Sequence, residues 1–214
     1  MLGRCLPGDK LPSERSMAEQ FGVSRTSIRE AIRVLVRYGL LEIKRGATGG
    51  AIVRDMIGNG VRERMRSFAR ARKKDYVQLL EFRLVVECAA ARLAAVRRNP
   101  ADLRILREHV RNMDSLFAEA ADHAEGLVAI RFYAEDTAFH IAIGKASGNS
   151  HMHDTIEELR YKLLLPLSRV VAELDERAND KHCEIVDAIE AGDGNLAEAL
   201  MRAHIKGSFE SVFN

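Results

Sequence analysis

Residues 11–53 read LPSERSMAEQFGVSRTSIREAIRVLVRYGLLEIKRGATGGAIV, and this stretch determines the fold of the N-terminal part of the chain. Ser13 precedes a helical pattern and is a favoured N-cap residue, while Gly22 is a favoured residue for the end of a helix. Within this short helix the apolar side chains fall on one stripe, at Met17, Ala18 and Phe21. The pattern predicts a first helix with one face packed against a neighbour.

A second helix and two strands follow. Ser24 caps the helical pattern TSIREAIRVLVRYG at residues 26–39, which Gly39 ends. The expected inner face of this helix holds Ile28, Ala31, Ile32 and Leu35. LLEIKRG and GGAIV are typical of two short strands around a glycine-rich tip. Helix, glycine turn, helix and β-hairpin together predict a winged helix-turn-helix.

In this fold the second helix enters the major groove of DNA, and its N-terminal residues face the base edges. The polar residues at that position are Ser24, Arg25, Thr26, Ser27 and Arg29. Arg forms two hydrogen bonds with guanine, and Ser and Thr bind phosphates or bases. The wing tip, with Arg45 and Gly46, is expected to reach the DNA backbone or minor groove. The alternative is that these arginines are ordinary exposed helix charges.

Residues 7–46, PGDKLPSERSMAEQFGVSRTSIREAIRVLVRYGLLEIKRG, resemble the DNA-binding domain of the GntR family of bacterial transcription regulators. The resemblance implies DNA contacts by Arg15, Arg25, Arg29, Arg45 and Gly46. Members of this family carry a further helix of some twenty residues before the PGDKLP segment, and this chain begins close to that point. We therefore expect the first helix of the domain to be truncated.

The net charge of +2 is unevenly distributed along the chain. Residues 1–74 contain 17 Lys and Arg and 7 Asp and Glu, a balance of +10, whereas residues 75–214 contain 16 and 24, a balance of −8. A basic first third favours a polyanionic partner for that part only. The expected organisation is a DNA-binding domain at 1–57, a basic linker at 58–74 and a helical domain at 75–214.

The composition is that of a globular protein, with 47% hydrophobic and 30% charged residues. No apolar stretch approaches the roughly 20 residues of a membrane-spanning helix, and the N-terminus lacks the apolar core of a signal peptide. Cys5, Cys88 and Cys183 are too few and too far apart for a disulfide framework. We expect a bacterial cytoplasmic protein associated with the nucleoid, with no membrane partner.

From Tyr76 onward the sequence shows helix signals only. Pro166 is expected to kink one of these helices, and a Gly-Asp-Gly turn at 192–194 joins the last two. The expected helices cover residues 76–98, 100–120, 125–147, 150–174, 176–194 and 195–213. The fold class is therefore mainly α: a winged helix-turn-helix with a small β-hairpin, followed by an antiparallel bundle of six to seven helices.

Two polar residues interrupt the apolar face of the helix expected at 125–147. Asp136 and His140 are one turn apart, and a buried ionised carboxylate is costly unless it is paired or bound to a cation. His182 and His204 lie about ten residues before and after the turn at 192–194, so they reach nearly the same height in a helical hairpin. One Asp and three His suit zinc, nickel or manganese. Satisfied core histidines, a simple Asp–His pair, or a site at His151 and His153 are the alternatives.

Four further segments, EFRLVVECAAARLAA, DTAFHIAIGKASGN, KHCEIVDAIEAGD and AEALMRAHI, resemble the FCD effector-binding domain of the FadR subfamily of GntR regulators. The resemblance implies a divalent metal, zinc foremost, held by Asp136, His140, His182 and His204. It also implies a homodimer and a small carboxylate effector that completes the metal coordination. Arg83 and Asn149 match positions that contact the effector. For Arg83 a salt bridge to Glu87 at i+4 is the alternative.

These patterns predict a metabolite-responsive transcription regulator, a repressor in the commoner family mode, that binds a pseudo-palindromic operator as a dimer. One alternative is a metalloenzyme that activates water at the Asp and His residues. No additional acid–base residue accompanies them, and the DNA-reading module would then have no role. A second alternative is a DNA-binding dimerisation module without an effector.

Overall fold

The computed structural model describes residues 8–37, 39–46, 49–54, 73–120, 125–164 and 179–213. The chain divides into two compact units, Met1–Ser67 and Phe68–Asn214. The predicted linker at 58–74 falls almost wholly outside the described residues, as do the predicted kink at Pro166 and the predicted truncated first helix. None of the described helices is long and apolar enough to cross a membrane.

The first unit begins with two helices, α1 (Glu14–Phe21) and α2 (Arg25–Arg37). The Ser16 backbone N–H donates to the Ser13 hydroxyl, which caps α1 as predicted, and Gly22 ends the helix with a φ of 64° that suits glycine. Met17, Ala18 and Ile28 form the buried core between the two helices. Phe21 and Ala31 are exposed instead of inward-facing, and Phe21 is the last residue before the chain turns at Gly22.

The wing is an antiparallel hairpin of β1 (Leu41–Lys44) and β2 (Gly50–Val53), with Leu41 opposite Val53 and Lys44 opposite Gly50. Gly46 lies at the tip with a φ of 114°, a backbone conformation that side chains other than glycine rarely adopt. Leu40 and Leu41 are buried, which fixes the base of the hairpin on the unit. The predicted winged helix-turn-helix order is confirmed.

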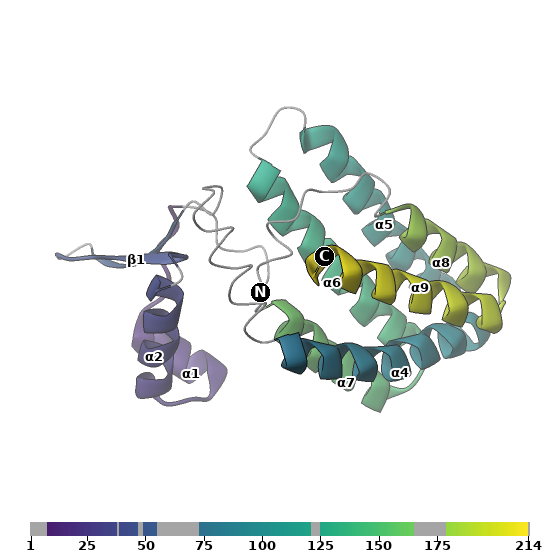
Figure 1. Ribbon diagram of the computed structural model, residues 1–214, viewed down its shortest axis with the longest axis horizontal. Coiled ribbons are helices and arrows are strands. Elements are labelled where there is room, and N and C mark those ends of the chain that lie inside the picture. Colours follow the sequence, from purple (N-terminus) through teal and green to yellow (C-terminus); the bar gives the residue numbers. More distant parts are fainter. Residues whose placement is uncertain are drawn as a thin grey trace. The chain divides into compact units, whose positions relative to one another are not determined.

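The second unit contains six helices among its described residues. They are α4 (Lys73–Arg97), α5 (Pro100–Ala120), α6 (Glu125–Ala146), α7 (Ser150–Leu164), α8 (Asp180–Ala191) and α9 (Gly194–Phe213). In Figure 1, α9 runs alongside α4, and α5 lies beside α6. The mainly α fold with a helical bundle, predicted from the sequence, is confirmed.

Small side chains allow the helices of this bundle to approach closely. On α4, Ala90, Ala91, Ala94 and Ala95 are fully buried where α6, α8 and α9 pack. Large apolar side chains fill the layer between the helices, including Phe139, Ile185 and Met201, each with no exposed surface. The inner faces of α6, α8 and α9 therefore meet at one place, and the polar residues of those faces are brought together.

Candidate nucleic-acid interface and metal centre

The N-terminal turn of α2 presents its polar residues on the surface. The Ser27 backbone N–H donates to Ser24 Oγ at 3.0 Å, so Ser24 caps α2 as predicted. Every residue predicted to contact DNA is exposed: Arg15, Ser24, Arg25, Thr26, Ser27, Arg29, Arg45 and Gly46. Their exposure leaves them accessible to a nucleic acid, and their contacts with DNA stay a prediction.

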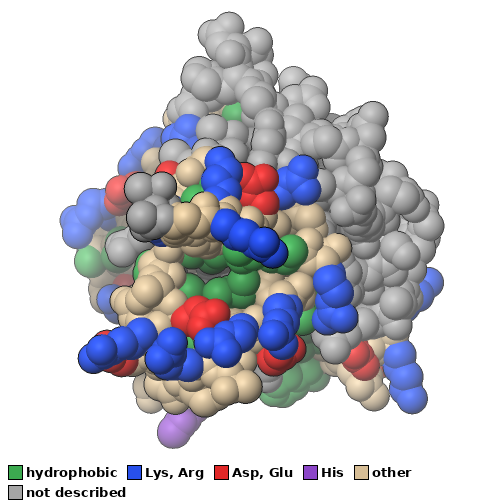
Figure 2. All heavy atoms as spheres, turned by 90° about the vertical axis from the view of Figure 1, so that its left-hand side faces the viewer, with side chains coloured by type: hydrophobic (Ala, Val, Ile, Leu, Met, Phe, Trp, Pro, Cys, Tyr) green, Lys and Arg blue, Asp and Glu red, His purple; other side chains and the backbone are tan. Residues whose placement is uncertain are grey.

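Arg29 is held by an acidic residue of the other helix. The Arg29 guanidinium donates from Nε and Nη2 to both carboxylate oxygens of Glu14 on α1, with the shortest contact at 2.7 Å. The hydrogen bond from Arg29 is the main cause that lowers the pKa of Glu14. Arg15 forms a single hydrogen bond, from its Nε to Glu19 Oε1 at 3.0 Å, on its own helix. Figure 2 shows basic side chains interleaved with acidic ones on one face of the molecule. Glu14 was not among the residues predicted from the sequence to bear on DNA contacts.

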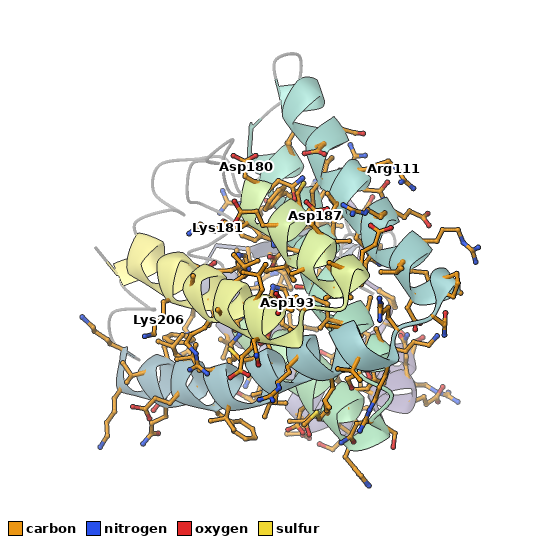
Figure 3. All side chains as sticks on the ribbon, turned by 90° about the vertical axis from the view of Figure 1, so that its right-hand side faces the viewer. Arg111, Asp180, Lys181, Asp187, Asp193 and Lys206 are labelled. Carbon is orange, nitrogen blue, oxygen red and sulfur yellow. The ribbon has the colours of Figure 1, made fainter. Side chains whose placement is uncertain are left out.

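Side chains from three helices of the second unit form a buried cluster. Asp136 and His140 come from α6, His182 from α8 and His204 from α9. Each is at least 94% buried, and one ligand atom from each lies within 4.8 Å of all the others. In Figure 3, Asp180 marks the start of α8, Asp193 the turn between α8 and α9, and Lys206 lies on α9. The hairpin of α8 and α9 therefore brings the two histidines together as the spacing predicted.

The distances within the cluster suit a shared cation. Asp136 Oδ1 lies 3.2 Å from His182 Nε2, 3.6 Å from His140 Nε2 and 4.0 Å from His204 Nε2. The Nε2 atoms of His140 and His204 are 3.2 Å apart. Lone pairs that approach so closely repel unless a proton or a metal ion lies between them. Three imidazole nitrogens and one carboxylate oxygen form a donor set that could hold a divalent metal ion.

Asn179 fixes the orientation of His182. Its amide nitrogen donates to the Val110 carbonyl and to Asp114 Oδ1, so its oxygen faces the ring of His182. His182 Nδ1 lies 3.1 Å from that oxygen and therefore carries the proton. The lone pair of Nε2 is then directed to the cluster, as a metal ligand requires.

His140 meets a buried carboxylate on its outer side. Its Nδ1 atom lies 2.6 Å from Glu87 Oε2, although this contact is not aligned as a hydrogen bond. Arg83 Nε donates to the other oxygen of Glu87 at 2.5 Å. A carboxylate that contacts the outer nitrogen of a ligating histidine is a common arrangement around metals. From the sequence, Glu87 was expected only as a partner for Arg83.

The electrostatics favour the ionised form of Asp136 and the neutral forms of His182 and His204. Burial opposes ionisation of Asp136, but Arg160 together with the neighbouring histidines holds the pKa of this carboxyl well below its usual range. Burial lowers the pKa of His182, and burial with the nearby imidazoles lowers the pKa of His204 further. Neutral imidazoles and an ionised carboxylate are the forms that bind metals.

Arg160, on α7, is the second charged residue that the sequence analysis missed. Its Nη2 atom donates to Asp136 Oδ2 in a very short contact and lies 3.2 Å from Thr137 Oγ1. The side chain is 2% exposed. In the sequence, its only signal is its place beside Ile156 and Leu159 on the buried face of α7.

Each of the two predicted effector residues has a partner within the protein. Arg83 forms the salt bridge to Glu87 that was the alternative for this residue, and both side chains are buried. Asn149 precedes α7, where its side-chain oxygen accepts a hydrogen bond from the Met152 N–H at 3.3 Å. It therefore caps that helix. The roles of Arg83 and Asn149 toward an effector stay predictions.

The remaining described histidines lie apart from this cluster. His109 Nδ1 contacts Glu135 at 2.8 Å, and His153 Nδ1 lies 3.3 Å from the Ile141 carbonyl. His151 is exposed. Among the residues that the structure describes, the only group of histidines and acidic residues suited to a metal is the one at Asp136. The weaker alternative at His151 and His153 has no such convergence.

Comparisons with known proteins match both units. Residues 1–49 match the model of "Bacterial regulatory proteins, gntR family", and residues 78–207 match that of the FCD domain. The chain is 34% identical to the HTH-type transcriptional regulator LutR of Bacillus subtilis over 211 residues, which cover 95% of this chain and 91% of LutR. It is 30% identical to an Escherichia coli K12 protein provisionally named L-lactate dehydrogenase operon regulatory protein, covering 92% of this chain and 76% of that protein.

Solved structures share the fold. The structure of E. coli McbR/YncC superposes with a TM-score of 0.60 at 19% identity, covering 99% of this chain and 90% of that one. At this identity the similarity concerns the fold alone. The order of the winged helix-turn-helix and the helical bundle is therefore found in a known protein.

Proposed function

Because the chain belongs to the GntR family of bacterial regulatory proteins and has an FCD domain, we propose that it is a repressor of the FadR subfamily whose operator affinity depends on a small carboxylate bound beside a divalent metal. The family and the similar proteins are transcription regulators that bind DNA, and they are not enzymes. The observation that carries the proposal is the pair of features in one chain: an exposed polar turn on α2 and a buried Asp and three His in the bundle.

The first part of the proposal concerns DNA. It assigns base contacts to the N-terminal turn of α2 and backbone contacts to the wing. Arg25 and Arg29 are one turn apart and exposed, as residues that enter a major groove must be. A duplex selected from a random-sequence library provides the test. Arg25→Ala and Arg29→Ala should each weaken binding to this duplex by about tenfold and relax its sequence preference. Unchanged affinity and unchanged salt dependence in both variants would exclude α2 as the reading helix.

We propose a homodimer that reads two half-sites of a pseudo-palindrome. An exposed apolar stripe on α4 supports a partner surface, because Phe82, Val85 and Val96 project from one side of this helix and are 49%, 69% and 69% exposed. Sedimentation at micromolar concentration should give twice the mass of the chain. Val85→Glu should shift the protein toward the monomer and weaken operator binding, whereas Val23→Glu, at an exposed valine of the other unit, should leave the mass unchanged.

The second part of the proposal assigns a divalent metal ion to Asp136, His140, His182 and His204. Zinc is the first candidate, with nickel and manganese as alternatives. When bound, the ion would supply a Lewis acid with a coordination position for a carboxylate oxygen. Metal analysis of the purified protein tests this assignment. Metal should be present in the native protein, should be removed by a chelator, and should be absent from a His182→Ala, His204→Ala double variant.

The third part of the proposal, control of DNA binding by a small carboxylate, is tested on the complex with the operator. The E. coli relative is named for the operon of an enzyme that acts on L-lactate, so L-lactate is the first acid to test. It should weaken operator binding by metal-loaded protein and not by chelator-treated protein. If no small acid has this effect and the double histidine variant binds the operator normally, the chain is a DNA-binding dimerisation module with a histidine core. Metal-dependent turnover of substrate would instead favour a metalloenzyme.

A further inference from the structure

Arg160 carries donors that the fold leaves without acceptors. Among the described residues, its Nε and Nη1 atoms are buried and have no hydrogen-bond partner. These two nitrogens carry three of the five N–H groups of the guanidinium. Because buried polar groups in native proteins are nearly always paired, such a concentration of free donors on one charged side chain indicates a missing acceptor.

The position of Arg160 identifies where that acceptor binds. Its third nitrogen, Nη2, contacts Asp136 Oδ2, and the other oxygen of the same carboxylate faces His182 at 3.2 Å. The free donors of Arg160 are therefore separated from the metal position by one carboxylate group.

The charges of the buried groups specify an anion. Among the described residues the buried charged side chains are Arg83, Glu87, Asp136 and Arg160, two of each sign. Imidazoles bind a metal ion in their neutral form, so the three histidines add no charge when the cluster holds an ion. A divalent ion in the cluster therefore leaves two uncompensated positive charges in a buried site, which is costly without an anionic ligand.

The other buried arginine does not offer the same donors. Arg83 Nε and Nη2 both contact Glu87, and Glu87 also contacts His140. Arg83 thus belongs to the groups that orient a histidine from outside the cluster. Neither of its nitrogens Nε and Nη2 is left for a ligand.

We propose that Arg160 binds the carboxylate of the effector, and that this anion also reaches the metal held at Asp136. The proposal assigns to Arg160 the role that the sequence resemblance gave to Arg83. It rests on the proposed function for the presence of metal and of a carboxylate effector. The ligand class is a small organic acid whose carboxylate is ionised at neutral pH.

The test compares two charge-conserving variants of the two buried arginines in the full chain. Arg160→Lys keeps a positive charge beside Asp136 but loses the free guanidinium donors, and Arg83→Lys keeps a positive charge beside Glu87. Each protein is loaded with Co²⁺, whose visible spectrum reports the coordination of the ion. L-lactate is then titrated, followed by acetate, malonate and citrate, with lactamide as the uncharged analogue of lactate.

In the wild type an acid should change the cobalt spectrum saturably, and lactamide should not. Arg160→Lys should bind cobalt but require at least ten times more acid for the same change. Arg83→Lys, which acts on His140 through Glu87, should lower the affinity for cobalt but leave unchanged the acid concentration needed once cobalt is bound. Equal responses of Arg160→Lys and wild type, or a loss confined to Arg83→Lys, would overturn the proposal. Loss of cobalt binding in Arg160→Lys would also overturn it, because Arg160 would then act only by holding Asp136.

Operator binding separates failure of this inference from failure of the proposed function. If acid binding depends on Arg160 but leaves operator affinity unchanged, the proposed regulation is wrong and the assignment of Arg160 stands. If none of the acids changes the wild-type spectrum, the assignment of Arg160 is wrong, and so is the proposed control of DNA binding by a carboxylate effector.

Discussion

Each unit of the molecule contains an arginine–glutamate pair, and the two pairs differ chiefly in burial. In the first unit, Arg29 and Glu14 are 49% and 30% exposed, whereas in the second Arg83 and Glu87 are 3% and 1% exposed. An exposed pair is solvated and exchanges partners readily, so a phosphate or a base can replace Glu14. A buried pair cannot lose one member without leaving a charge in the interior. The first pair therefore suits recognition of a partner, and the second suits a fixed site.

The largest expected effect comes from breaking the buried pair. Glu87→Met leaves the Arg83 charge without its carboxylate, which should lower the free energy of unfolding by about 3–5 kcal/mol. Urea denaturation of the metal-free protein measures this change. The double variant Arg83→Met, Glu87→Met removes both charges and should recover most of the loss. If the single and double variants are equally destabilised, packing and not charge explains the effect.

A smaller effect is expected from the amide that orients His182. Asn179→Ala removes the acceptor of His182 Nδ1, so the ring loses its fixed orientation and metal affinity should fall about 10- to 100-fold. Competition with a chromophoric chelator measures the affinity. Asn112→Ala is the matched control, because Asn112 donates to the exposed side of Glu135. Equal affinities in the two variants would show that Asn179 serves the fold alone.

Periodicity and capping signals predicted most of the fold. Ser13, Gly22 and Ser24 act locally, through hydrogen bonds within one turn or through backbone conformation, so their positions in the sequence determine their roles. The predicted convergence of Asp136, His140, His182 and His204 also follows from local rules, because a helical hairpin with a short turn fixes which residues lie at the same height. The structure brings these four together, and their metal binding stays a prediction.

The groups around the cluster could not be found in this way. Arg160 meets Asp136 across 24 positions of sequence, and Asn179 reaches the Val110 carbonyl across 69. Such contacts depend on how α5, α7 and α8 pack, which periodicity within one helix does not specify. Arg83 is the converse case, since its i+4 spacing to Glu87 made the salt bridge visible in the sequence.

The next smaller effect is expected from lowering the pH, which should destabilise the second unit and not the first. Burial lowers the pKa of His182 and His204, so below the usual value of 6.5 the unfolded chain binds protons that the folded chain does not. Stability contributed by these neutral imidazoles is therefore lost as the pH falls from about 7 to 5 in the metal-free protein. Glu87 and Asp136, with lowered pKa values, add a loss below about pH 4.5.

Residue-resolved hydrogen exchange measures this difference. Protection of α8 and α9 should decrease between pH 7 and pH 5, after correction for the intrinsic exchange rate. The unit with α1 and α2 contains no histidine, so its protection should stay constant over that range. His204→Gln should reduce the pH dependence of α8 and α9. An equal decrease in both units would mean that the imidazoles are not its cause.

The smallest effect on stability is expected at the exposed pair, where the consequence should appear in DNA recognition. Glu14→Gln should leave the melting temperature unchanged, because both side chains are solvated. Loss of the carboxylate near Arg25, Arg29 and Arg33 should strengthen binding to a scrambled duplex, while Arg29, no longer held, should discriminate bases less well. The ratio of affinities for the selected and scrambled duplexes should therefore fall.

Glu30→Gln, which removes the ion pair of Arg33 and leaves that of Arg29 intact, is the control. If both variants change the ratio equally, Glu14 acts through its charge alone and holding Arg29 does not contribute to specificity.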